Sequence, residues 1–140
     1  MSEQCFINIK LNAKYEYPNI HKILSTGELL GFEYHDHICA QMYDNSPIIN
    51  ALEATDKVLS ALQNQTDDGP CVYTVLNCGS TIMLWFYKYG TDGLNLYVGD
   101  FGGDYKKKDG YVDLGYYIPI VLKLCEDFVI LNVEAKYIGE

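Results

Sequence analysis

Three consecutive β-rich segments in the second half of the chain are the feature that most constrains the fold. Segments 71–78, 81–89 and 94–101 are rich in Val, Ile, Tyr, Phe and Trp, which favour strands. Short stretches around Gly79 and around Gly90 to Gly93 separate them, and such glycine turns typically close antiparallel hairpins. The sequence therefore predicts an antiparallel β meander.

The segment before the meander predicts an amphipathic helix. Ser46 and Pro47 are typical of an N-cap and a first helical position, and apolar residues recur at helical spacing as far as about Gln63. The face predicted to be buried consists of Ile48, Leu52, Thr55, Leu59 and Leu62.

In the N-terminal third, residues 6–11 alternate as a strand that places Ile7, Ile9 and Leu11 on one face. Within 15–24, Pro18 and Asn19 predict the start of a short helix, which Gly27 is expected to break. Residues 29–39 are predicted to be extended.

In the C-terminal third, 102–110 is rich in Gly, Lys and Asp and predicts a mobile surface loop. Residues 113 to about 127 are predicted to form a helix despite Gly115 and Pro119, and its core is expected to start at Pro119, because proline is tolerated in a first turn. Residues 128–138 fit either a continued helix or an edge strand. The predicted architecture is α+β: one domain over 1–140 with an antiparallel β meander and one or two helices packed on one face.

Composition and cysteine usage bear on the compartment. With 140 residues and 49% apolar content, the chain can bury one core without disulfides or metal. It contains no apolar run of membrane-spanning length and no apolar leader typical of a secretory signal. Its five cysteines are irregularly spaced, which is typical of reduced thiols. We therefore expect a soluble, cytoplasmic protein.

The charge argues against nucleic acid as a partner. The net charge is −9, and all ten basic residues are lysine. Arginine supplies the planar fork that binds phosphate and guanine edges, and nucleic-acid affinity comes mainly from neutralised phosphates. We therefore expect no binding to nucleic acid.

The acidic residues are unevenly distributed. Between Glu28 and Asp68 there are eight carboxylates and a single lysine, Lys57. This pattern fits a solvated surface, and it also fits a negative field that steers a basic partner. On the second interpretation, the candidate partner-binding residues are Asp36, Asp67, Asp68, Asp92, Asp100, Asp104 and Tyr105.

A possible metal or catalytic site lies in the extended segment. On a strand, Glu33, His35, His37 and Cys39 would share one face, and such side chains can bind zinc. No second ligand cluster accompanies them, so we expect no metal and no cofactor. A Cys–His nucleophile has no local signature, and Cys71, Cys78 and Cys125 lie in apolar runs typical of unreactive buried thiols. The chain is therefore predicted not to be an enzyme.

Tyrosine is abundant, with thirteen residues. Tyr87, Tyr89 and Tyr97 alternate along the meander, whereas other tyrosines flank the glycine-rich segment 102–110. Tyrosine is favoured at protein interfaces but also has high β propensity, so both a binding surface and packing on the sheet remain open. Trp85 is expected in the core or on the sheet surface.

The order of elements resembles that of immunity proteins from bacterial polymorphic-toxin and contact-dependent growth inhibition systems. The similar stretch runs from 46 to 101: a helix at 51–62, an aromatic second strand containing Leu84 to Tyr87, a glycine turn, and a strand at 94–98. The resemblance implies a binding protein that neutralises a toxin domain, often a basic nuclease, by occluding its active site.

Two other classes of function stay open. One is a small metal-dependent or thiol enzyme centred on His35, His37 and Cys39. The other is a ligand-binding or structural module. The sequence does not determine the oligomeric state.

Overall fold

The computed structural model describes residues 4–35, 48–64 and 70–138. They form a seven-stranded antiparallel sheet in the order β3-β2-β4-β5-β6-β1-β9, together with three helices. The α+β class with an antiparallel meander is confirmed, with one helix more than predicted. The sheet strands are β1 (Gln4–Lys14), β2 (Glu33–His35), β3 (Ile48–Ile49), β4 (Cys71–Val75), β5 (Ser80–Tyr89), β6 (Gly93–Gly103) and β9 (Ile130–Ile138). A two-stranded hairpin consists of β7 (Lys107–Lys108) and β8 (Tyr111–Val112), and the helices are α1 (Tyr17–Leu29), α2 (Ala51–Asn64) and α3 (Leu114–Leu124).

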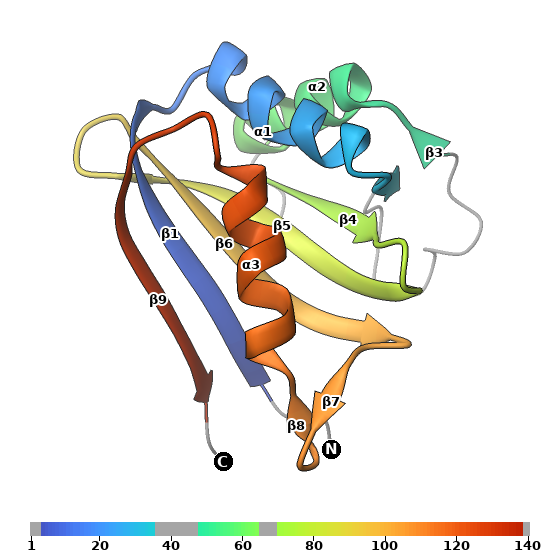
Figure 1. The fold of residues 1–140 in the computed structure, drawn as a ribbon. Helices are drawn as coiled ribbons and strands as arrows, with labels where there is room; N and C mark the ends of the chain where they lie inside the picture. Colours follow the sequence, from blue (N-terminus) through green and yellow to red (C-terminus); the bar gives the residue numbers. More distant parts are fainter. Residues whose placement is uncertain (1–3, 36–47, 65–69, 139–140) are drawn as a thin grey trace.

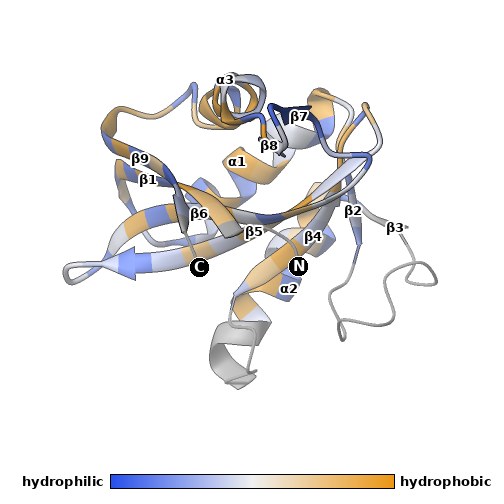
Figure 2. Ribbon diagram, turned by 90° about the horizontal axis from the view of Figure 1, so that it is seen from below, coloured by the Kyte–Doolittle hydropathy of each residue, from blue (hydrophilic) through white to orange (hydrophobic). Residues whose placement is uncertain are grey.

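The helices pack against one another and against the sheet. Helix α3 crosses the sheet in front of β1 and β6, and α2 lies behind α1, where it contacts β2, β3 and β4 (Figure 1). Seen from below, α1 and α3 lie on the same side of the sheet (Figure 2). None of the described helices is long and apolar enough to cross a membrane.

Alternation along the long strands separates two different faces of the sheet. One face is aliphatic: Ile7, Ile9 and Leu11, which share a face of β1 as predicted, are fully buried. It continues through Ile82, Leu84 and Phe86 on β5 and Leu94, Leu96 and Val98 on β6, which join the core cluster with side chains of all three helices. Burial of this face against the helices supplies most of the hydrophobic stabilisation. The opposite face is aromatic and is described below.

The prediction that Gly27 breaks the first helix is wrong, because α1 runs through it to Leu29. A Cβ at position 27 would collide with the hydroxyl of Tyr34 and would lie 3.0 Å from Phe32. Tyr34 is 1% exposed, and its hydroxyl donates a hydrogen bond to the Leu24 carbonyl at 2.8 Å. Glycine at position 27 therefore allows β2 to approach the helix closely.

Helix α2 begins later than predicted. Its N-cap is Asn50, whose side-chain oxygen accepts a hydrogen bond from the Glu53 N–H at 2.9 Å. Ile48 and Ile49 instead pair with β2, while Ser46 and Pro47 lie outside the described residues. The predicted buried face is correct at Thr55 and wrong at Leu52, which is 53% exposed. Among residues 51–60, whose burial the structure describes, Ala51, Ala54, Thr55 and Val58 are buried.

Helix α3 begins at Leu114, within one residue of its predicted start, but Pro119 lies inside it and not at the start of its core. The Asp113 side chain accepts a hydrogen bond from the Tyr116 N–H and so fixes the helix start.

The predicted loop at 102–110 contains strand β7, which pairs with β8 across Asp109 and Gly110. Both turn residues have positive φ, as a tight hairpin requires. Residues 130–138 form an edge strand, not a helix.

We expect Gly27→Ala to lower the free energy of unfolding by about 1–2 kcal/mol. Alanine gains up to about 1 kcal/mol of helix propensity, but overpacking against Tyr34 and Phe32 costs about 1–3 kcal/mol. Gly115→Ala in α3 is the matched control, because its Cβ would meet only Asp113 Oδ1, at 3.3 Å. Urea denaturation measures both variants. Equal or greater stability of Gly27→Ala would contradict the close approach.

Candidate functional site

Of the predicted partner-binding residues that the structure describes, Asp92 lies apart from Asp100, Asp104 and Tyr105. Asp36, Asp67 and Asp68 lie outside the described residues. Asp92 lies in the turn between β5 and β6, whereas Asp100 lies near the other end of β6. These two carboxylates are eight positions apart along an extended strand, which corresponds to about 26 Å.

Asp104 and Tyr105 follow the end of β6, beside the turn between β4 and β5. The Asp104 N–H donates a hydrogen bond to the Gly79 carbonyl at 3.2 Å. The Lys107 ammonium lies 4.9 Å from the centre of the Tyr105 ring, and Tyr105 packs against the core. Because Lys106, Lys107 and Lys108 follow directly in sequence, lysines offset the local negative charge here.

The described part of the possible metal site contains Glu33 and His35. As predicted, both lie on one face of β2, opposite Val75 and Tyr73 of β4. The His35 ring contacts Tyr73 edge-on at 5.9 Å, and its Nδ1 atom is buried without a hydrogen-bond partner among the described residues. His37 and Cys39 lie outside the described residues, and the part of the chain that is described contains no cluster of three potential metal ligands.

A cluster of aromatic rings lies on the sheet face opposite α1 and α3, and we call it the aromatic face. It consists of Phe6 on β1, Trp85 and Tyr87 on β5, and Tyr97 on β6. Tyr97 is its centre: the ring stacks on Phe6 at 5.2 Å and meets Trp85 and Tyr87 edge-on at 5.6 and 6.3 Å. The register explains this grouping, because Trp85 and Tyr97 are directly opposed in antiparallel strands.

The margins of the aromatic face combine exposed apolar surface with charge. Tyr87 is 41% exposed. The Lys136 ammonium lies 5.7 Å from the Phe6 ring centre. Partial burial raises the pKa of Tyr97, and the negative charge of Asp100 raises it further. Asp100 is thus the predicted partner-binding acid that lies beside the aromatic face.

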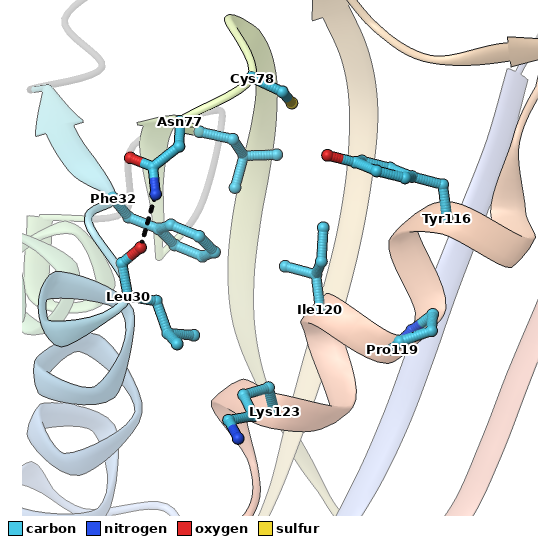
Figure 3. Close-up of a pocket in the computed structure, with 9 residues that line it drawn as sticks. Leu30, Phe32, Asn77, Cys78, Tyr116, Pro119, Ile120 and Lys123 are labelled. Atoms are coloured by element: carbon cyan, nitrogen blue, oxygen red, sulfur yellow. Dashed lines mark hydrogen bonds between the residues drawn. The ribbon is translucent and has the colours of Figure 1, made fainter.

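A pocket of about 340 Å³ lies between the end of α1, the turn after β4 and the exposed side of α3 (Figure 3). Its apolar lining comprises Leu30, Phe32, Leu76, Pro119 and Ile120. The polar groups at its margin are Asn77, Cys78, Tyr116 and Lys123, and Asn77 donates a hydrogen bond to the Leu30 carbonyl at 2.8 Å. Size and lining match those of small-molecule pockets.

Cys78 differs from the thiols in the core. Its sulfur lies 2.9 Å from Ser80 Oγ, and Figure 3 shows it directed toward the Tyr116 hydroxyl. Partial burial pushes the Cys78 pKa upward, but hydrogen bonds with Ser80 and Tyr116 and the nearby Lys106 charge together lower it below its ordinary value. Burial instead raises the pKa of Cys125 to about 12. The expectation of an unreactive buried thiol thus fits Cys125 and not Cys78, which is half-buried.

We expect iodoacetamide to alkylate Cys78 well before Cys125 or the buried Cys5, since the thiolate is the reactive form. The rate should rise with pH through an inflection below that of an ordinary thiol. Tyr116→Phe should slow Cys78 alkylation at neutral pH by up to about tenfold, as expected when a hydrogen bond to a charged group is lost. Tyr111→Phe is the control. Mass spectrometry of time-quenched digests gives each rate, and equal rates at Cys78 and Cys125 would contradict the assignment.

Comparisons with family models, with curated proteins and with solved structures found no match to this chain. The function proposed below therefore follows from the chemistry of the surface and from the resemblance in element order.

Proposed function

We propose that this chain is a cytoplasmic, non-enzymatic binding protein of the immunity type, which neutralises a basic, nuclease-type toxin domain by covering it. The observation that carries the proposal is the aromatic face. A sheet face rich in Tyr, Trp and Phe has the composition that protein interfaces favour. Such a surface fits a stoichiometric inhibitor, because it provides contact area without catalytic groups.

Tyr97 is suited to act as the anchor of this interface. It contacts three other rings, so its side chain is already ordered before a partner binds. A pre-ordered aromatic side chain loses little conformational entropy on binding, and hot spots are typically such residues. Tyr87, which is 41% exposed, offers further apolar area beside it.

The charge of the chain supports a basic partner. A net charge of −9 attracts a positive surface over distances longer than any contact, and this raises the association rate. Stacked aromatic rings can also bind single-stranded nucleic acid, but that requires cations along the backbone. The described charges beside the aromatic face are Lys10, Lys136, Glu33, Glu134 and Asp100, which leave no net positive charge for a phosphate backbone.

Co-expression tests the function directly. The open reading frame immediately upstream of the gene is expressed in Escherichia coli alone and together with this chain. We expect the neighbour alone to arrest growth and co-expression to restore it, because the two proteins form a stoichiometric complex. A harmless neighbour, or a toxic one that this chain fails to neutralise, would contradict the immunity function.

Truncation of the aromatic face tests the surface. For the complex with the partner that co-expression identifies, Tyr97→Ala and Tyr87→Ala should each raise the Kd at least about 30-fold, the effect of removing a hot spot. Leu29→Ala is the matched control, since Leu29 is 88% exposed on α1, away from this face. Calorimetry gives Kd, and thermal melts identify any variant that loses the fold. Unchanged affinity in both tyrosine variants would exclude the aromatic face as the surface that binds the partner.

Electrostatic steering predicts a separate effect on rates. Asp100→Asn should lower the association rate modestly and reduce its dependence on salt, while the dissociation rate changes little, as for charges at an interface rim. Surface plasmon resonance between low and high salt measures this. Binding that is indifferent to salt, or tight binding to a single-stranded oligonucleotide, would contradict a basic protein partner.

The pocket beside Cys78 favours a second candidate function, the binding of a small apolar molecule. The test is protection: an occupied pocket should slow alkylation of Cys78 by iodoacetamide. 1-Anilinonaphthalene-8-sulfonate serves as the apolar probe, and Ile120→Trp, which fills the pocket, serves as the control variant. If the dye protects Cys78 equally in both proteins, the pocket is not its site.

A further inference from the structure

The long outer strand β9 has an unused edge. The sheet ends at β3, with two residues, on one side and at β9, with nine residues, on the other. Within the described ranges β9 pairs only with β1, so the backbone N–H and C=O groups that alternate outward meet no other strand. An edge of this length is a template on which another strand can pair.

The features of β9 that usually protect an edge strand are one register shift and the charges of Glu134 and Lys136. Its register shift falls between Asn132 and Ile130, which leaves Leu131 opposite no residue of β1. Pairing is regular from there to Ile138, and this stretch contains no proline. The edge also exposes apolar side chains, since Leu131 is 55% and Val133 39% exposed. Among the described residues no second strand pairs with this stretch, so its outer edge can take a partner strand.

The regular stretch Asn132 to Ile138 is complementary to itself. Its central residue is Ala135, and Glu134 and Lys136 flank it with opposite charges. In an antiparallel pair of identical strands centred on Ala135, each Glu134 lies opposite Lys136 of the second copy. Opposite charges in directly paired positions stabilise a sheet, and the two-fold axis provides this pair twice.

Other antiparallel registers are less favourable. The smallest register shift that keeps each side chain on its face of the sheet moves one strand by two residues. It places Glu134 opposite Glu134 of the second copy, or Lys136 opposite Lys136 of the second copy. Like charges directly opposite one another destabilise a sheet. The register centred on Ala135 also uses the whole regular stretch, because it extends three residues to either side.

We propose that β9 pairs antiparallel with β9 of a second copy of this chain about a two-fold axis at Ala135. The two seven-stranded sheets then join into one sheet of fourteen strands, seven from each copy. Paired residues in antiparallel strands point to the same face, so the two aromatic faces lie on the same side of the joined sheet. This dimer is independent of the proposed function, because it involves this chain alone.

Charge exchange tests the register. Sedimentation velocity from about 1 to 300 µM, the range in which transient interfaces dissociate, should show a concentration-dependent dimer of the native chain. Glu134→Lys and Lys136→Glu should each weaken dimerisation at least about tenfold, because each places like charges opposite one another twice. The double exchange Glu134→Lys with Lys136→Glu should restore it. Both side chains are at least half exposed, so stability should change little.

Cross-linking tests the axis. In Ala135→Cys, the two Cα atoms would lie about 4.5–5.5 Å apart, within the range of a disulfide. Mild oxidation should then yield a covalent dimer on a non-reducing gel. Val133→Cys is the matched control. In the register centred on Ala135, the two Cα atoms at position 133 would be offset by four residues along the strands, about 13 Å. The native chain controls for its own cysteines.

Three results would overturn the proposal. The first is a native chain that sediments as a monomer at all concentrations. The second is a double-exchange variant that dimerises as weakly as the single-exchange variants. The third is a Val133→Cys variant that cross-links as efficiently as Ala135→Cys. The first excludes the dimer, and the other two exclude this register.

Discussion

The alternation of side chains along the regularly paired parts of β1, β5 and β6 is the constraint on which the rest of the structure depends. Because successive residues point to opposite faces, Leu84 and Phe86 enter the core while Trp85 and Tyr87 cannot. A register shift of one residue between β5 and β6 would exchange the core-facing and outward-facing side chains, so that the helices would face tyrosine and tryptophan. The register therefore decides both where the helices pack and which face carries the aromatic rings.

Much of this arrangement could be predicted because strand alternation is a local property. Neighbouring residues determine the hairpin turns between 71 and 101 and the alternation at Ile7, Ile9 and Leu11. Tyr87 and Tyr97 were expected on the meander, either at a binding surface or packed on the sheet, and the structure places both on one face. Phe6 could not be added to it from sequence, because its contact with Tyr97 depends on β1 pairing with β6, a partner almost ninety residues away.

The errors have a common cause, which is that tertiary contacts overrode local signals. Gly27 is typically a helix breaker, yet it lies inside α1 because the Tyr34 side chain needs that space. Ser46 and Pro47 have the pattern of a helix start, but pairing of Ile48 and Ile49 with β2 moves the start to Asn50. The Cys78 pocket was missed for the same reason, since Ser80 and Tyr116 reach the thiol from separate elements.

The negative charge and the aromatic face have different physical roles. A net charge of −9 acts at long range and is screened by salt, so it governs how quickly a basic partner arrives. The aromatic rings act only on contact and set how slowly the partner leaves. Pairing through β9 would connect the two effects: it would place two aromatic faces on one side of a joined sheet and double the charge behind them. A partner able to engage both faces would then bind with an effective local concentration that one copy cannot provide.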